Sequence, residues 1–367
     1  MDPQIAADAG QTLLAGFQGV EAPPEPLAQA LRAGHLSGVI LFGRNLSKDD
    51  DRLWTLARLN QALDACRPDG GPPLFIGVDQ EGGRVQRVRE PATRVPPMAL
   101  VGARNDRELA ARVGEVIASE LAALGFNLNF APVLDVLTNP ANAVIGDRAF
   151  GSDVATVAEM AGALTVGHYV AGVVPCGKHF PGHGDTFADS HDELPIVMHE
   201  PAALEERELL PFARAIQAGL PMIMTAHLLI PAIDALHPIT LSPKGVRALL
   251  RDELEFGGVV VSDDLEMRAV ADRYTIEEMV ELGVRAGVDL FLICHTQEKW
   301  QRAFAHLTAL AAQDPAFRLL LGQAADRVRA LKARFLPRAP YTVPADLMDH
   351  LGTPAHLAVM ASVAGQA

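Results

Sequence analysis

Residues 171–191 read AGVVPCGKHFPGHGDTFADSH and contain the structural unit that recurs along the rest of the chain. Gly172 can adopt the left-handed conformation that ends a helix, and the apolar run after it is typical of a buried strand. The segment Lys178–His191 is polar, with three histidines and two aspartates. Because one proline and two glycines interrupt regular structure there, it is predicted to be a loop. Titratable groups gathered at the end of a buried strand indicate a catalytic or binding site.

The same pattern occurs six times. A predicted helix ends near a glycine and is followed by a short apolar run that ends in polar residues. The runs are SGVILFGRN (37–45), FNLNFAPVLD (126–135), VVPCGKHF (173–180), LPMIMTAH (220–227), GVVVSDD (258–264) and VDLFLICH (288–295). LFIGVD (74–79) adds a seventh strand, and an eighth is expected within Gln11–Phe17. Strands that are apolar throughout are buried on both faces, as parallel strands flanked by helices are. The pattern therefore predicts an α/β fold, a (β/α)8 TIM-type barrel in which the first strand could be irregular. An open doubly wound sheet is the alternative, but no GxGxxG follows the first strand.

Segments of helical period lie between the predicted strands. In Arg107–Leu124 the apolar residues recur at intervals of three and four, and Ala202–Ala218, Thr275–Ala286 and Phe317–Phe335 show the same spacing. After Phe335 three prolines mark a linker. We therefore expect one barrel domain over residues 1–336, followed at 337–367 by a proline-rich linker and a helical tail that either packs on the barrel or frays.

The amino-acid composition indicates a globular protein and disfavours some classes of partner. Of 367 residues, 49% are hydrophobic and 21% charged, which is typical of a globular chain with a sizeable core. A formal charge of -14 disfavours nucleic acid and anionic membrane surfaces as partners. Three widely spaced cysteines fit buried thiols in a reducing compartment. Without a signal sequence or a long apolar run, the expectation is a cytoplasmic protein with no membrane partner.

In a barrel the C-terminal strand ends share one face, so polar residues distant in sequence converge there. Together they form a ring of polar residues that suits a hydroxyl-rich ligand such as a carbohydrate, since carboxylates accept hydrogen bonds from hydroxyls and cations donate to them. No glycine loop of the phosphate-cradling kind accompanies it, and no cofactor is predicted. The predicted ring consists of Arg44, Asn45, Asp79, Gln80, Glu81, Asp135, Lys178, His179, His227, Asp263, Asp264 and His295.

Three chemistries could use this ring. The first is glycoside hydrolysis, with Asp263 as nucleophile at a strand end and Asp264 directed elsewhere. In that case Asp189 could orient His191, two residues away, as an acid/base group. The second is metal-assisted hydrolysis, in which His179, His183, His191 and an aspartate would be ligands, although their spacing fits no standard metal pattern. The third is carbohydrate binding without catalysis.

Purely structural roles are also possible for several of these residues. Asp135 could only cap a turn, and His227 could be a hydrogen-bonded core residue. Arg148 could merely pair with Asp147 or Glu81. His183 and Asp185 are expected to shape the loop.

Six motifs carry a family resemblance. They are GVDQEGGRVQR (77–87), NFAPVLDV (129–136), IGDRAFG (145–151), KHFPGHGDT with DSH (178–191), TAH (225–227) and SDDLEM (262–267). In this order they resemble the glycoside hydrolase family 3 β-N-acetylglucosaminidases of bacterial cell-wall recycling, over residues 10 to 335. The resemblance implies a barrel enzyme that removes terminal nonreducing N-acetylglucosamine with retention, through a covalent glycosyl-enzyme.

For the chemistry, the resemblance implies that Asp263 is the nucleophile and that Asp189 with His191 is the acid/base pair. Glucosidase members take a glutamate proton donor from a second domain that is not expected here, and the tail resembles the helix leading into it. A phosphorylase that passes the same glycosyl-enzyme to phosphate is an alternative. For the substrate, the resemblance implies sugar binding by the residues Asp79, Arg148, Lys178 and His179, and Arg84 of the first motif is a further candidate.

Overall fold

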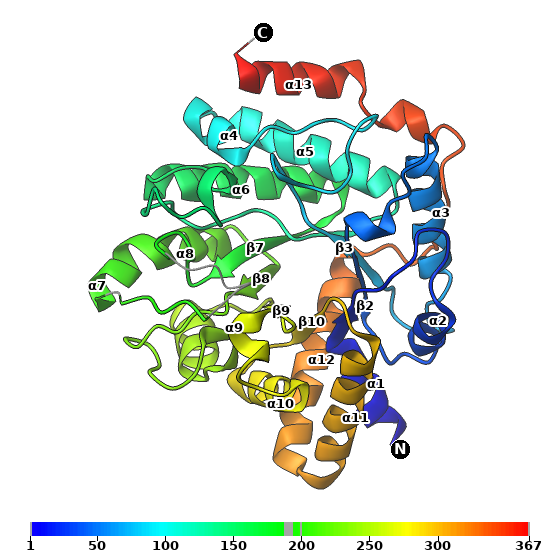
Figure 1. Cartoon of the computed structure of the whole chain (residues 1–367), viewed down its shortest axis with the longest axis vertical. Coiled ribbons are helices and arrows are strands. Elements are labelled where there is room, and N and C mark those ends of the chain that lie inside the picture. Colours follow the sequence, from blue (N-terminus) through cyan, green and yellow to red (C-terminus); the bar gives the residue numbers. More distant parts are fainter. Residues whose placement is uncertain (1, 187–193, 199, 366–367) are drawn as a thin grey trace.

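The computed structural model describes residues 2–186, 194–198 and 200–365. Its centre is a closed barrel of parallel strands in the order β1-β10-β9-β8-β7-β6-β3-β2 (Figure 1). Each strand lies within a segment expected from the sequence, so the predicted (β/α)8 barrel is confirmed. The strands are β1 Leu13–Ala15, β2 Gly38–Leu41, β3 Phe75–Val78, β6 Leu128–Asn129, β7 Val174–Phe180, β8 Met222–Thr225, β9 Val259–Asp264 and β10 Leu290–Ile293.

The eighth expected strand, β1, closes the barrel. It is three residues long and follows the short helix α1 (Pro3–Gln11), which explains why Gln11–Phe17 could also be taken for the start of a helix. Leu13 pairs with Phe291 of β10, and Leu14 pairs with Gly38 of β2. At Gly38 a Cβ would lie 2.1 Å from the carbonyl oxygen of Phe75, so only glycine allows this close strand approach.

Helices surround the barrel and alternate with its strands. The α5 helix starts at the predicted residue, and α10 begins with a capping box between Thr275 and Glu278. The predicted helix 202–218 is divided, because a π-helical turn, Leu204–Glu208, separates α7 from α8. No helix among the described residues combines the length and apolar character needed to cross a membrane. The α-helices are α2 Glu25–Arg32, α3 Arg52–Asp64, α4 Met98–Arg104, α5 Arg107–Ala123, α6 Val154–Ala171, α7 Pro201–Ala203, α8 Leu209–Gln217, α9 Arg268–Ala271, α10 Ile276–Ala286, α11 Gln297–Gln313, α12 Pro315–Phe335 and α13 Pro354–Ala364.

One end of the barrel is closed by α12. Val328 and Leu331 of this helix join the apolar cluster inside the barrel, which includes Phe75 and Phe130. The buried Lys332 of α12 donates hydrogen bonds to the carbonyl of Ser37 (2.7 Å) and to the side chain of Gln11 (3.0 Å), both just before strands begin. The N-terminal ends of the strands are therefore filled, which leaves the C-terminal ends for a ligand.

A small antiparallel hairpin extends from the C-terminal end of β3. It consists of β4 (Gln80–Gly82) and β5 (Val85–Gln86), and the sequence did not predict it. Gly82 and Gly83 have φ values of 105° and 57°, which the tight turn requires. The hairpin raises one wall of the barrel mouth.

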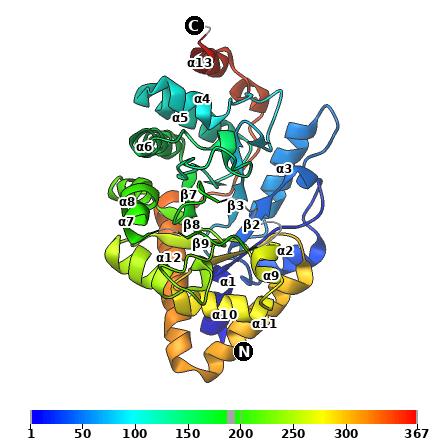
Figure 2. The ribbon, with the colours of Figure 1, turned by 60° about the vertical axis from the view of Figure 1, so that its left-hand side comes forward.

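The C-terminal segment packs on the barrel domain. Helix α13 lies beside α4 and α5 in both views (Figures 1 and 2). Glu120 of α5 accepts hydrogen bonds from Gly352 N and His356 Nδ1, both at 2.8 Å. The sequence left open whether the tail packs on the barrel or frays, and the structure shows it packed through residue 365.

Candidate active site

A cavity of about 220 Å³ opens at the C-terminal ends of the strands. It lies where the sequence placed the polar ring, and most of the predicted strand-end residues line it. Apolar side chains from the hairpin, the loops and the barrel interior complete the walls. Its lining is Ile40, Phe42, Asp79, Glu81, Val85, Arg87, Val144, Ile145, Arg148, Lys178, His179, His183, Met224, Asp263, Asp264, Met267, Leu292, Cys294 and His295.

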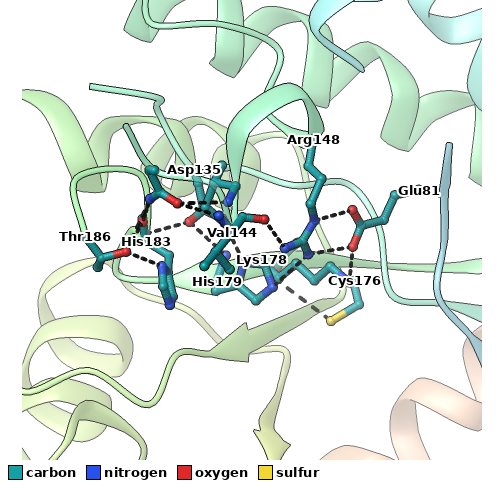
Figure 3. A network of polar contacts seen from close by, with 12 residues as sticks. Glu81, Asp135, Val144, Arg148, Cys176, Lys178, His179, His183 and Thr186 are labelled. Carbon is teal, nitrogen blue, oxygen red and sulfur yellow. Dashed lines mark hydrogen bonds and ion pairs between the residues drawn. The ribbon is translucent and has the colours of Figure 1, made fainter. Parts of the chain in front are cut away.

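Two carboxylates and two cations form a connected cluster in this cavity. Glu81 accepts two hydrogen bonds from Arg148, at 2.8 Å to Nε and 2.8 Å to Nη2 (Figure 3). Lys178 Nζ lies 2.6 Å from Glu81 and 2.8 Å from Asp79. The pairing of Arg148 with Glu81, considered from the sequence as a structural role, is therefore present inside the cavity itself.

The cluster keeps its charges despite being buried. Burial opposes ionisation of Glu81, but Arg148 and Lys178 outweigh it and lower the pKa of this carboxyl. Burial likewise disfavours the ammonium of Lys178, yet Asp79 and Glu81 raise its pKa. Both groups are thus charged at neutral pH. Glu81 was recognised in the sequence only as a strand-end residue, and its central place in the cluster was missed.

His179 is held in one orientation by Asp135. The buried carboxylate accepts a hydrogen bond from His179 Nδ1 (2.7 Å) through Oδ2. Its other oxygen accepts from the backbone N–H groups of His179 (3.1 Å) and His183 (2.7 Å). Asp135 is therefore more than the turn cap considered from the sequence, because it also directs His179 Nε2 toward Arg148 Nη2, 3.4 Å away (Figure 3).

Asp263 occupies the end of β9 and is partly buried in the cavity wall. Burial tends to raise its pKa, but His179, His227 and the N–H of Asp264 outweigh this effect and lower the pKa. One oxygen, Oδ1, accepts the N–H of Asp264 at 2.8 Å. The Asp263 carboxylate is therefore ionised, and the backbone N–H of the next residue fixes its orientation. His227 is a buried residue that hydrogen-bonds Thr240 (2.9 Å) and the Asp264 carbonyl (3.0 Å), as the structural interpretation expected.

Asp264 is bonded differently from Asp263. It lines the cavity as well, but its Oδ1 accepts N–H groups from Glu266 (3.0 Å) and Cys294 (3.2 Å). Its Oδ2 lies 3.3 Å from His295 Nε2, and Arg44 Nη1 donates to His295 Nδ1 at 3.2 Å. Asp263 and Asp264 thus differ in the groups that they bond to, but both side chains line the cavity.

Arg84 of the hairpin lies outside this cavity. Arg84 is half exposed, pairs with Asp147 at 3.2 Å and is absent from the cavity lining, so its role in substrate binding stays a prediction. Asp189 and His191 lie outside the described residues. In the same loop, Asp185 accepts a hydrogen bond from Thr138 (3.0 Å) and lies 3.4 Å from Arg207 Nη2.

His183 both lines the cavity and shapes the loop beside it. Its Nδ1 lies 2.8 Å from Thr186 Oγ1, and its carbonyl accepts a hydrogen bond from Asn142 at 2.8 Å. The described residues contain no group of three or more metal-ligating side chains. The metal alternative also needs His191, which lies beyond that part of the chain.

Comparison with known proteins identifies the family of this chain. Residues 8–330 match the glycosyl hydrolase family 3 N-terminal domain. The chain belongs to glycosyl hydrolase family 3. It is therefore a glycoside hydrolase, as the motifs predicted. The family-3 chain is 44% identical over 266 residues to a β-hexosaminidase from Nitrosomonas eutropha, an overlap that spans 71% of this chain and 74% of the relative.

Solved structures agree with this assignment. A family 3 β-N-acetylglucosaminidase from Paenibacillus sp. str. FPU-7 superposes with a TM-score of 0.90 at 38% identity, covering 98% of this chain and 68% of that one. NagZ from Neisseria gonorrhoeae, in complex with N-trifluoroacetyl-D-glucosamine, gives a TM-score of 0.79 at 32% identity, with 97% of both chains covered. This chain is thus a family 3 hydrolase of the β-hexosaminidase type.

Proposed function

We propose that this family 3 enzyme is an exo-acting, retaining β-N-acetylglucosaminidase in which Asp263 is the nucleophile. The observation that carries the proposal is the bonding of the cavity carboxylates. Among the cavity carboxylates that the structure describes, Asp263 is the one without an ion-pair partner, and its Oδ2 accepts no hydrogen bond. An ionised carboxylate on a rigid strand end, with one oxygen available, is suited to attack an anomeric carbon.

The other cavity carboxylates are engaged. Asp79 pairs with Lys178, and Glu81 pairs with both Lys178 and Arg148. Asp264 is bound by two backbone N–H groups and by His295. The charge of each of these carboxylates is balanced by its partner, which weakens it as a nucleophile, so they are better suited to holding the substrate or the site.

The charged cluster of the cavity supports binding of a sugar ring. Asp79 and Glu81 supply acceptor oxygens to the cavity, and Lys178, Arg148 and His179 supply nitrogens. Hydroxyl groups donate and accept, so a polyol can join such a network without leaving a buried charge unpaired. A pocket of about 220 Å³ that ends against these buried groups suits one terminal residue, which supports exo action. N-acetylglucosamine is proposed as that residue because relatives include β-N-acetylglucosaminidases.

The proton donor in this mechanism is His191, oriented by Asp189. Both residues lie outside the described part of the chain, and the described cavity offers no second unengaged carboxylate for the task. In the first step Asp263 bonds to the anomeric carbon while protonated His191 transfers its proton to the departing oxygen. In the second step neutral His191 takes a proton from water, which attacks the same carbon and releases Asp263. Two inversions give retention.

The resemblance to cell-wall recycling enzymes supports muropeptides as the natural substrate and the cytoplasm as the location, and both remain proposals. Transfer of the glycosyl group to phosphate instead of water would use the same residues. Assaying turnover with and without phosphate, and analysing the product for sugar 1-phosphate, separates the two reactions.

The nucleophile is tested by mechanism-based labelling. A 5-fluoro N-acetylglucosaminyl fluoride should accumulate on the enzyme, and peptide mass spectrometry should locate the label on Asp263. Asp263→Ala should reduce turnover of a chromogenic N-acetylglucosaminide by on the order of 10⁴-fold or more. The control Asp272→Ala, at an exposed aspartate, should not. A label on another carboxylate, or wild-type turnover by Asp263→Ala, would exclude the assignment.

The role of His191 is tested with leaving groups of different acidity. His191→Ala should be most defective with poor leaving groups that need protonation, and less so with a nitrophenolate. An equal loss for all leaving groups would count against its role as the acid.

A further inference from the structure

The side chain of Asp264 is held by two residues that the mechanism above does not use. Its Oδ2 lies 3.3 Å from Nε2 of His295, and Nδ1 of His295 lies 3.2 Å from Nη1 of Arg44. An arginine only donates hydrogen bonds, so Nδ1 accepts in this contact and Nε2 carries the proton that is donated to Asp264. The hydrogen bond to Asp264 raises the pKa of His295. Because Nε2 carries a proton in both the neutral ring and the cation, this bond persists on either side of that pKa.

Arg44 is a fixed support for His295. Its Nε donates to the carbonyl of Phe17 at 2.9 Å, its Nη2 donates to the carbonyl of Cys294, and its guanidinium lies over the ring of Phe42, 4.4 Å from the centroid. Phe17 follows β1, Arg44 follows β2 and Cys294 follows β10, so one guanidinium joins three strand ends. His295 extends this connection to β9, the next strand around the barrel.

Strand pairing is irregular at the point where Asp264 lies. The register between β9 and β10 shifts between Leu290 and Leu292, and Leu292 is the residue that pairs with Asp264. The carboxylate of Asp264 accepts the N–H of Cys294 at 3.2 Å, a backbone donor that regular pairing would give to a carbonyl. Irregularities of this kind redirect side chains beside active sites. The position of Asp264 therefore depends on its side-chain contacts, including the one with His295, as well as on the strand ladder.

The backbone of Asp264 in turn fixes the nucleophile. Its N–H donates to Oδ1 of Asp263 at 2.8 Å, and its carbonyl accepts a hydrogen bond from His227 at 3.0 Å. Burial raises the pKa of Asp263, and the groups that outweigh burial are His179, His227, the N–H of Asp264 and Lys178. A displacement of Asp264 would therefore turn the Asp263 carboxylate and weaken the bond that favours its ionised form.

We propose that His295 is a positioning residue for the reaction, which holds Asp264 and thereby keeps the backbone N–H of Asp264 on the nucleophile Asp263. This inference rests on the proposed function, because it assumes that Asp263 attacks the sugar. The side chain of His295 is 53% exposed, so solvent screens its charge and its contribution is geometric. Its ring packs against Phe42, with centroids 5.8 Å apart, which limits its rotation.

The test compares His295→Leu, which removes both ring nitrogens, with His295→Gln, whose amide nitrogen can take the place of Nε2. The substrate is 4-nitrophenyl β-N-acetylglucosaminide, because its leaving group needs little protonation and kcat/KM then reports attack by Asp263. His295→Leu should lower kcat/KM on the order of 10-fold. It should also move the acid limb of the kcat/KM profile to higher pH, since a carboxylate that loses a donor ionises less readily. His295→Gln should restore most of both properties.

Two further measurements separate positioning from other roles. The inhibition constant of N-acetylglucosamine should change by less than about twofold in both variants, because sugar binding is assigned to Asp79, Lys178 and their partners. His306→Leu is the matched control, since Nε2 of His306 lies 3.2 Å from the carboxylate of Glu281 on helices outside the cavity. This control should keep the wild-type kcat/KM and pH profile.

Wild-type kcat/KM and an unmoved acid limb in His295→Leu would overturn the positioning role. A weaker inhibition constant with an unmoved acid limb would also overturn it, because His295 would then bind the sugar itself. Equal losses in His295→Leu and His295→Gln, accompanied by equal falls in Tm, would indicate a purely structural role and overturn it as well. If the fluorosugar labels a carboxylate other than Asp263 in the wild type, the proposed function fails, whatever the variants do. Should His295→Leu not fold, His295→Ala takes its place.

Discussion

Replacing Glu81 by glutamine should damage both the stability of the protein and its sugar binding. The Glu81 side chain is 2% exposed and is the shared partner of Arg148 and Lys178. Glutamine has nearly the same shape but carries no charge, and its amide nitrogen would face a cation. The variant therefore leaves two buried cations with one nearby carboxylate, Asp79, to balance them.

The magnitude follows from the loss of one partner of a buried ion pair, which typically costs about 3–5 kcal/mol. Unfolding entropy of roughly 2.1 cal/mol/K per residue, over 367 residues, amounts to about 0.8 kcal/mol per kelvin. Glu81→Gln should then lower Tm by about 4–6 °C. Loss of orientation of Arg148 and Lys178 should also reduce kcat/KM on the order of 10²-fold, since small misplacements of binding groups have effects of that size.

The dependence on pH provides a second check. The folded-state pKa of Glu81 is lowered, so its stabilising contribution is complete above the unfolded pKa of about 4.3. That contribution declines as pH falls below this value and disappears once pH has fallen through the lower folded pKa. The difference in Tm between wild type and Glu81→Gln should therefore be constant from about pH 5 to 8 and shrink in more acidic buffer.

Differential scanning fluorimetry and substrate kinetics measure these effects. Glu25→Gln is the matched control, because Glu25 is 66% exposed and its ion pair with Arg32 lies on the surface. The control should shift Tm by less than about 1 °C. If Glu81→Gln behaved like the control in both Tm and kcat/KM, the reasoning from buried charge would be wrong.

Two further predictions concern groups that act through others. Asp135→Asn should reduce kcat/KM on the order of 10²-fold, because an amide nitrogen facing His179 Nδ1 disfavours the present tautomer; a wild-type value at unchanged Tm would argue against an orienting role. Glu120→Ala should increase hydrogen exchange in α13 and cost about 1–3 kcal/mol, because Gly352 N and His356 Nδ1 lose their acceptor. Glu115→Ala, at an exposed glutamate of the same helix, should leave exchange in α13 at the wild-type level.

Local sequence pattern was sufficient for much of the site. Asp79, Lys178, His179 and Asp263 each stand where an apolar run ends, and parallel strands in a barrel place such ends on one face. Their convergence in one cavity is a consequence of topology, so it could be expected before any coordinates were known. Arg84 shows the limit of that reasoning, because a motif position does not say which way a hairpin side chain points.

The sequence by itself determined the barrel and which residues end its strands, since glycine-ended helices and buried apolar runs are local properties of the chain. Only the tertiary structure decided how the charges combine: Glu81 is 67 residues from Arg148, and Asp135 is 44 from His179, yet both pairs are in hydrogen-bond contact. Such contacts depend on side-chain directions across neighbouring strands and loops, over distances of a few ångströms. They leave the Asp263 carboxylate without an ion-pair partner in the described part of the chain, and no one-dimensional pattern encodes that fact.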